Sequence, residues 1–294
     1  MTTPTFSNRA LALGAACLVP WIASAADGEY SYQSSAREAR QSPEEIEDIG
    51  EIVGDKGAGF SRSKFRASVT TREQFTTNAQ LSGNHLSGDF VFLPSVEVGY
   101  STDLGQHFRF DLSGRLESAL YARFDERSFY GYSAVATLDY RPKPDAPRVY
   151  VTAEPYRYVS YDTGDRITQA LGFGVGTDWG RSFNGGRSLF YAGYSFMVFL
   201  ADPGVDDRTQ HSIVLGLAHA FTARLTGQVF YSWQYSDFDI DRTDSRHIVG
   251  SNLLYQFARD WFGSITMSFV DTDSTQDFSS YQAFGASLGV TRQF

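Results

Sequence analysis

From Phe65 to Phe294 the chain repeats one pattern: long segments of alternating apolar and polar side chains, separated by polar turns. In residues 107–121, for example, one face carries Phe108, Phe110, Leu112, Leu116 and Leu120, and the other carries Arg109, Asp111, Ser113, Arg115 and Glu117. A period of two residues is typical of a β-strand whose two faces meet different surroundings. The sequence therefore predicts an all-β fold.

The alternating segments are long for a soluble sheet. We expect strands at 65–75, 90–101, 107–121, 129–141, 148–161, 167–179, 187–200, 209–221, 223–236, 245–258, 259–271 and 281–294. Soluble strands typically have about 5–6 residues, whereas about ten are needed to cross a bilayer at a tilt. The expected count is about twelve, in a range of roughly ten to fourteen, and an even number suits a closed antiparallel barrel. Tight connections such as 258–259 alternate with longer acidic ones such as 237–244, as at the two ends of such a barrel.

Composition favours a membrane protein that crosses with strands. Aromatic residues make up 15% of the chain, yet its mean hydropathy is -0.29. A membrane helix needs about 20 consecutive apolar residues, and no such run follows the first 26 residues. Aromatic residues such as Tyr130, Tyr140 and Trp261 gather at the ends of the apolar faces, as in interfacial belts. Because lipid cannot satisfy an open sheet edge, we predict a closed antiparallel transmembrane β-barrel over 65–294.

Residues 1–25 have the layout of a secretory signal peptide. Arg9 supplies a positive charge, an apolar stretch runs from Ala10 to Ile22, and Ala23-Ser24-Ala25 forms an A-x-A cleavage site. Cys17, in a weak match to a lipoprotein box, lies inside the apolar stretch. Ordinary cleavage would remove this one cysteine, so neither a disulfide nor thiol chemistry is expected in the mature protein.

Residues 26–64 form an acidic N-terminal extension. Ser42-Pro43-Glu44-Glu45 is a good start for a short helix, and Ile46, Ile49, Ile52 and Val53 then share one face. Such a short amphipathic helix is marginal on its own and needs a surface to dock on. The extension is therefore a plug for the barrel, a segment (26–60) that recruits a periplasmic partner, or a disordered tail.

The last strand carries the most specific feature. Phe284, Leu288, Val290 and Phe294 share one face, opposite Gly285 and Gly289. In this strand, and more loosely over 1–25 and 65–294, the chain resembles the transmembrane β-barrels of Gram-negative outer membranes. The resemblance implies contact with outer-membrane lipids and lipopolysaccharide, and makes those four residues a signal read by the barrel-assembly machinery. Arg292 departs from the pattern, which has an apolar residue there, and could reach lipid head groups.

A set of charged residues would line the lumen if the polar faces point inward. These residues are Arg66, Arg72, Glu97, Arg109, Asp111, Arg115, Glu117, Asp139, Glu154, Asp178, Arg187, Arg224, Arg246 and Asp260. They form either a network that braces the wall or a channel lining in which arginines facing acids attract anionic or polar solutes. In 167–179 the inward positions are small, including Gly172, Gly174 and Gly176, which predicts a bend of the wall or a groove that receives another element.

The function expected first is a porin-like channel for passive passage of small hydrophilic solutes. A structural or secretion-accessory barrel is the alternative, and an outer-membrane lipid-modifying enzyme or hydrolase is third. His211 and His219 share the lipid-facing side, and only Ser245 lies close enough to His247 for a nucleophile–base pair, without an evident orienting Asn or Asp. The sequence therefore predicts no catalytic site.

Other ligand classes find little support in the sequence. The net charge of -9 argues against nucleic acid as a partner. Residues 237–241 begin like a calcium loop, but Arg242 stands where that loop needs glycine. We therefore expect no cofactor and no dedicated metal site.

Overall fold

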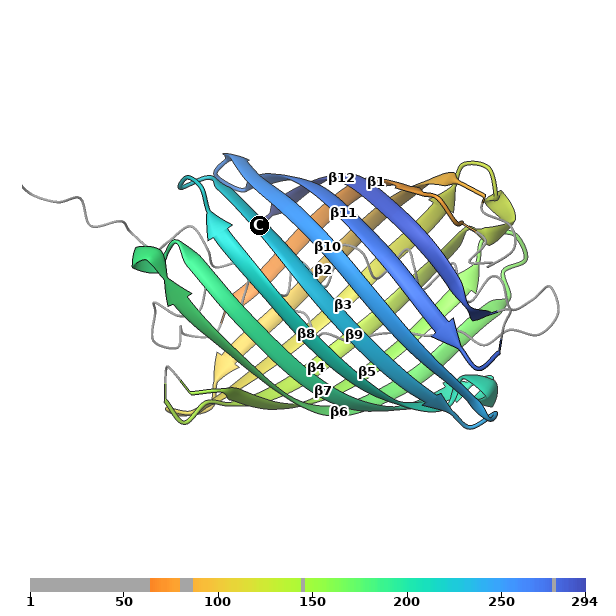
Figure 1. Cartoon of the computed structure of the whole chain (residues 1–294), viewed down its shortest axis with the longest axis horizontal. Helices are drawn as coiled ribbons and strands as arrows, with labels where there is room; N and C mark the ends of the chain where they lie inside the picture. Colours follow the sequence, from red (N-terminus) through yellow and green to blue (C-terminus); the bar gives the residue numbers. More distant parts are fainter. Residues whose placement is uncertain (1–63, 80–86, 144–145, 277–278) are drawn as a thin grey trace, which may run out of the picture.

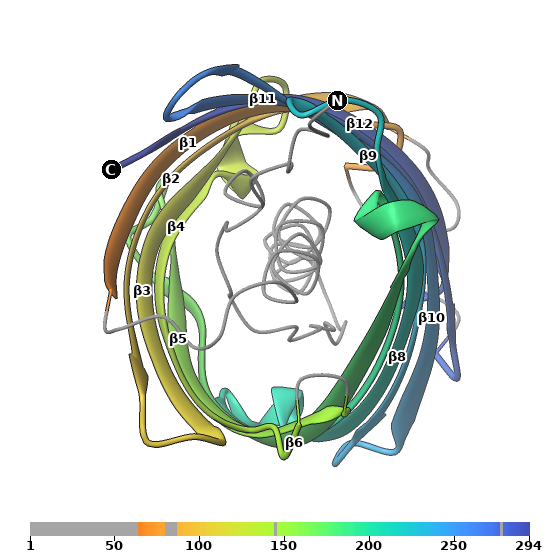
Figure 2. The ribbon, with the colours of Figure 1, turned by 90° about the vertical axis from the view of Figure 1, so that its left-hand side faces the viewer.

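A computed structural model describes residues 64–79, 87–143, 146–276 and 279–294. Twelve strands close there into one antiparallel barrel, in which sequence neighbours pair and β1 pairs with β12 (Figure 1, Figure 2). The strands are β1 Lys64–Thr76, β2 Asp89–Asp103, β3 Phe108–Tyr121, β4 Phe129–Tyr140, β5 Arg148–Ser160, β6 Arg166–Phe183, β7 Ser188–Asp202, β8 Arg208–Ala220, β9 Leu225–Phe238, β10 Arg242–Ala258, β11 Trp261–Ser274 and β12 Tyr281–Gln293. The predicted closed all-β barrel is confirmed. The predicted signal peptide, acidic helix and plug fall in residues 1–63, outside the described residues.

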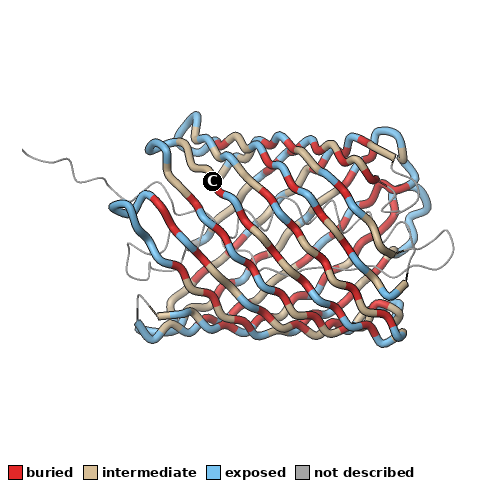
Figure 3. Tube along the Cα trace, viewed as in Figure 1, coloured by how far each residue is buried: buried red, intermediate tan, exposed pale blue. Residues whose placement is uncertain are grey.

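Every strand alternates between exposed and buried positions, as Figure 3 shows along the tilted wall. In β3, Leu116 is 62% exposed on the outer face while Asp111 and Ser113 are buried on the inner face. The outer face is therefore an apolar band that only a nonpolar solvent would cover well. None of the helices in the described ranges is long or apolar enough to cross a membrane.

Two prolines sit inside strands, each where the pairing with one neighbouring strand is interrupted. Opposite Pro94, the β2–β3 register passes from Phe92↔Leu120 to Ser95↔Glu117. Pro155 likewise lies where the β4–β5 pairing is interrupted. Proline has no N–H to donate, and the pairing is missing on one side of each proline. On the other side the pairing continues, with Pro94 opposite Thr71 of β1 and Pro155 opposite Leu171 of β6.

The two ends of the barrel differ in their connections. At the turn end lie 104–107, 141–147, 184–187, 221–224 and 259–260, and at the loop end lie 77–88, 122–128, 161–165, 203–207, 239–241 and 275–280. The predicted long loop at 237–244 is wrong, because β9 continues to Phe238 and β10 starts at Arg242. Tight turns and longer connections are thus less cleanly separated than the sequence suggested.

Aromatic pairs lie near both ends of the outer face. At the turn end, the ring centroids of Phe65 and Tyr100 are 4.9 Å apart, as are those of Phe108 and Tyr140. At the loop end, the Tyr130 and Tyr161 ring centroids are 5.2 Å apart. Two such bands are the arrangement expected at the two interfaces of a bilayer.

The seam between β1 and β12 closes the wall. Its register runs from Ser68↔Gln293 to Thr76↔Gly285, so the first residues of β1 extend beyond the end of β12. The Thr70 and Thr291 hydroxyls lie 3.0 Å apart across the seam. The Phe294 N–H then donates to the Ala67 carbonyl at 2.9 Å, so the C-terminal residue continues the seam.

Candidate functional site in the barrel lumen

Large rings on the inner wall lie against glycines of the neighbouring strand. Five such pairs stand directly opposite in register: Gly131–Tyr158, Gly172–Phe199, Gly176–Tyr150, Gly216–Tyr191 and Gly250–Phe230. A Cβ at Gly131 would come within 2.2 Å of the Tyr158 ring, and one at Gly216 within 1.8 Å of the Tyr191 hydroxyl. We call these the ring–glycine pairs. They let bulky side chains lie along the wall rather than across the lumen.

The predicted groove on β6 is occupied by these neighbours. The Phe199 ring covers Gly172, Met197 covers Gly174 and the Tyr150 ring covers Gly176. The expectation of an open groove at these glycines is therefore wrong. They are small because side chains of β5 and β7 need the space.

A continuous row of charges crosses the inner wall of β1, β2 and β3 toward the turn end. Arg66 on β1 lies 4.0 Å from Glu97 on β2 and 3.9 Å from Asp111 on β3. Arg115 approaches Glu97 at 3.9 Å, and Arg109 Nε lies 3.0 Å from Asp111. Ser101 adds a hydroxyl that donates to Asp111.

The row continues on β4, β5 and β6. Arg148 Nη1 lies 3.4 Å from Asp139, and Arg148 Nη2 lies 2.6 Å from Asp178. These ion pairs join neighbouring strands of one wall rather than facing each other across the lumen. We call the whole row, from Arg66 to Asp178, the charge ladder. The sequence analysis did not place Arg148 in the lumen because Arg148 is the first residue of its strand. It lies two positions before Tyr150 and so on the same inner face, which could have identified it.

The other predicted lumen residues divide into two groups. Arg72, Glu154 and Arg246 are buried on the inner face, and Glu117 there accepts a hydrogen bond from the Tyr158 hydroxyl at 2.8 Å. Arg187, Arg224 and Asp260 are exposed in connections of the turn end. Their placement on the lumen wall is corrected: their parity matched the inner face, but the strands end before or start after them.

A second charged group, missed in the sequence, lies on β8 and β10 at the loop end. Arg242 Nε donates to both carboxylate oxygens of Asp244, at 2.9 and 3.1 Å, and Arg242 Nη2 also donates to Asp244. Ser274 donates to Asp244 at 2.5 Å. The Arg208 guanidinium lies 4.2 Å from the centre of the Phe199 ring. Arg242 and Asp244 were missed because 237–244 was interpreted as a loop, and Arg208 was missed because it lies just before the strand expected at 209–221.

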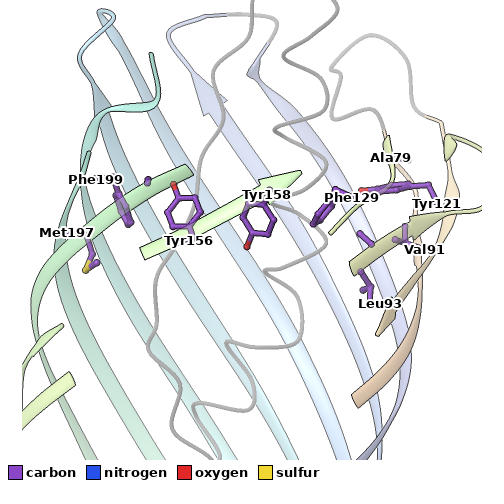
Figure 4. Packing of buried hydrophobic residues seen from close by; sticks show 11 residues of the cluster. Ala79, Val91, Leu93, Tyr121, Phe129, Tyr156, Tyr158, Met197 and Phe199 are labelled. Atoms are coloured by element: carbon purple, nitrogen blue, oxygen red, sulfur yellow. The ribbon is translucent and has the colours of Figure 1, made fainter. Parts of the chain in front are cut away.

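Apolar side chains cover the inner wall between these charged regions. One cluster, drawn in Figure 4, gathers near the loop end of β2 to β7; it contains Ala79, Val91, Leu93, Ala119, Tyr121, Phe129, Tyr156, Tyr158, Ala170, Met197 and Phe199. A second runs across β7 to β11 with Leu189, Tyr191, Val214, Phe230, Ile248 and Val270. The lumen lining therefore combines charged, polar and aromatic surfaces.

The histidines of the strands face outward. His247 Nδ1 lies 2.8 Å from the Tyr231 hydroxyl, and Ser245 accepts a hydrogen bond from Trp233 Nε1 at 3.1 Å. Ser245 and His247 thus interact with different aromatic residues rather than with each other. Within the described ranges, no group of three or more His, Cys, Asp or Glu side chains is arranged to hold a metal ion.

Replacing Arg148 with glutamine should destabilise the barrel. Asp139 and Asp178 would lose their shared cation, and breaking a buried pair costs about 3–5 kcal/mol. Because the Arg148 side chain is 24% exposed, we expect about 2 kcal/mol after solvent screening. Urea unfolding in detergent micelles measures this loss. The double variant Arg148→Gln/Asp178→Asn should lose less, and equal stability of Arg148→Gln and the unaltered protein would contradict the role of the ladder.

Comparisons with known proteins agree with this architecture. Residues 200–294 match the family model described as "Putative beta-barrel porin 2". An outer membrane channel from Pseudomonas putida F1 superimposes with a TM-score of 0.52 at 11% identity, covering 82% of this chain and 98% of that one. No curated protein sequence matches the chain.

Two further structures align with lower TM-scores. The translocator domain of the autotransporter NalP from Neisseria meningitidis gives 0.48 at 11% identity, covering 82% of this chain and 91% of that one. The outer membrane channel DcaP of Acinetobacter baumannii gives 0.44 at 10% identity, with 81% and 100% coverage. Neither carries the identification. It rests on the closed wall, the apolar outer band, the match of residues 200–294 to the porin-family model and the fold shared with the Pseudomonas putida F1 channel, which together identify the chain as a transmembrane β-barrel of the Gram-negative outer membrane.

Proposed function

We propose that the barrel is a porin-like channel for the passive passage of small hydrophilic solutes. The observation that carries the proposal is the lining of the lumen by charge along its length. The charge ladder lies toward the turn end, Arg72 and Glu154 lie farther along the strands, and Arg242 lies at the loop end. A polar lining lowers the cost of moving a hydrated solute through a membrane-embedded barrel.

Three features of the wall favour a channel over an enzyme or a purely structural barrel. The ring–glycine pairs hold large side chains against the wall. Ion pairs of the ladder such as Arg66–Glu97 and Arg148–Asp178 join neighbouring strands, which leaves the polar surface facing the lumen. Ser245 and His247, the nucleophile–base pair considered in the sequence, lie on the outer face and interact with other side chains.

Conductance of the purified full chain in planar bilayers tests the proposal. We expect stepwise current increments, and deletion of 27–60 should raise them if that segment acts as a plug. Unchanged increments would instead favour the segment as a docking site for a periplasmic partner. A heat-modifiable shift in gel migration serves as the folding control. Folded protein without conductance in either form would overturn the channel and favour the structural or secretion-accessory barrel.

A further inference from the structure

Arg246 on β10 is a buried cation, and one edge of its guanidinium makes no hydrogen bond to the residues that the structure describes. It is 2% exposed, shares the inner face with Arg242 and Asp244, and lies opposite Thr272 of β11. Its Nε and Nη2 have no hydrogen-bond partner among the described residues. Burying a charged donor without a partner costs free energy. An acceptor bound to this guanidinium would remove that cost.

The neighbouring Arg242 shows what that edge binds in this wall. Arg242 uses Nε and Nη2 together to hold the Asp244 carboxylate. Arg246, four positions along the same face, presents the same pair of nitrogens with no carboxylate. Asp244 is already held by Arg242 and Ser274, and no ion pair joins it to Arg246 within the described ranges.

Other groups beside Arg246 suit an oxyanion. The Thr272 hydroxyl is buried without a partner among the described residues, as are the Ser236 hydroxyl and Arg242 Nη1. The Tyr281 ring centre lies 6.0 Å from the Arg246 guanidinium and holds it by a cation–π contact. Arg246 and Thr272 stand opposite each other in the β10–β11 register, so the edge of Arg246 and the Thr272 hydroxyl supply donors from two neighbouring strands.

We propose that Arg246 and Thr272, with Arg242 nearby, bind a small oxyanion, a carboxylate or a phosphate, on the inner wall near the loop end. Guanidinium binds such groups through two parallel N–H···O bonds. The proposal depends on the proposed channel in one respect, which is that the anion reaches the site through the lumen. In the channel, this site would favour anionic over cationic solutes.

Calorimetric titration of the full chain in detergent tests this site. The probes are succinate and inorganic phosphate at constant ionic strength, with chloride as the reference anion; the tighter of the two identifies the class of oxyanion. We expect Arg246→Gln to weaken binding at least about tenfold, and Arg246→Lys to weaken it too, since lysine keeps the charge but loses the paired donors. Arg224→Gln, which removes an equal charge at an exposed turn, should bind like the unaltered protein.

The outcomes separate this inference from the channel. Absence of binding, or equal binding by Arg246→Gln and the unaltered protein, would mean that water satisfies Arg246, and the site would be rejected even if the protein conducts. Binding that depends on Arg246 in a protein that does not conduct would support the site and reject the channel. Heat-modifiable migration of each variant establishes that it is folded.

Discussion

Replacing Gly216 with valine is expected to prevent stable folding of the barrel. Its first added carbon would lie 1.8 Å from the Tyr191 hydroxyl and 1.9 Å from Cζ of the same ring. Tyr191 is 0% exposed and packs in the apolar cluster across β7 to β11, so its ring has little room to move away. Overpacking of a core costs about 1–3 kcal/mol and sometimes more. Because valine adds two methyl groups beyond its Cβ, we expect the destabilisation of this variant to lie at the upper end of that range. Loss of the heat-modifiable band and of cooperative thermal unfolding would be observed.

Two further variants show whether the clash is the cause. Gly114→Val on the outer face of β3 should fold, because its added Cβ meets its nearest atoms only at 3.9 Å. The double variant Tyr191→Ala/Gly216→Val should regain the folded band. If Gly216→Val proved as stable as Gly114→Val, the ring–glycine pairs would have no structural role.

The second large effect is expected at Phe294, proposed above as part of the assembly signal. Phe294 is 66% exposed, and the Arg292 guanidinium lies 4.5 Å from its ring centre and 5.3 Å from that of Trp261. Little of this ring is buried within the protein, so we propose that it serves recognition by the assembly machinery. Phe294→Ala should therefore lower outer-membrane levels about tenfold or more, if recognition contributes at least about 1.4 kcal/mol.

Arg292→Gln is the matched control for Phe294. Arg292 lies between two aromatic rings at the turn end, and its loss should affect outer-membrane levels far less. Refolding of Phe294→Ala from urea into detergent should proceed nearly as in the unaltered protein, since no assembly machinery is present. Equal membrane levels for the two variants, or a refolding defect as large as the cellular one, would refute the recognition role.

The wall was predictable from sequence because one strong rule governs it. Alternation at period two located all twelve strands and the inner face of residues such as Asp111 and Glu154. It failed at 237–244, where Asp237 and Thr243 face outward near the loop end and are polar. With both faces polar, the alternation that identifies a strand disappears.

The lumen was less predictable. The odd or even position of a residue along a strand tells which face of the wall it lies on, but not which residues of other strands it contacts. Arg148 joins Asp139 to Asp178 only through the registers of β4, β5 and β6. The ring–glycine pairs likewise depend on register, since Tyr158 and Gly131 belong to different strands. The alternation also placed Arg187, Arg224 and Asp260 on the lumen wall, where they do not lie. Alternation carries no information on where a strand stops, and these residues lie in connections.

The seam between β1 and β12 also sets an order of events in time. Thr70 and Thr291, whose hydroxyls meet there, are 221 positions apart in the chain, so closure is the most non-local step of folding. Until the last strand arrives, β1 presents a row of unpaired backbone groups that invites pairing with other chains. A chain crossing the periplasm must therefore be kept from aggregating until β12 has paired with β1.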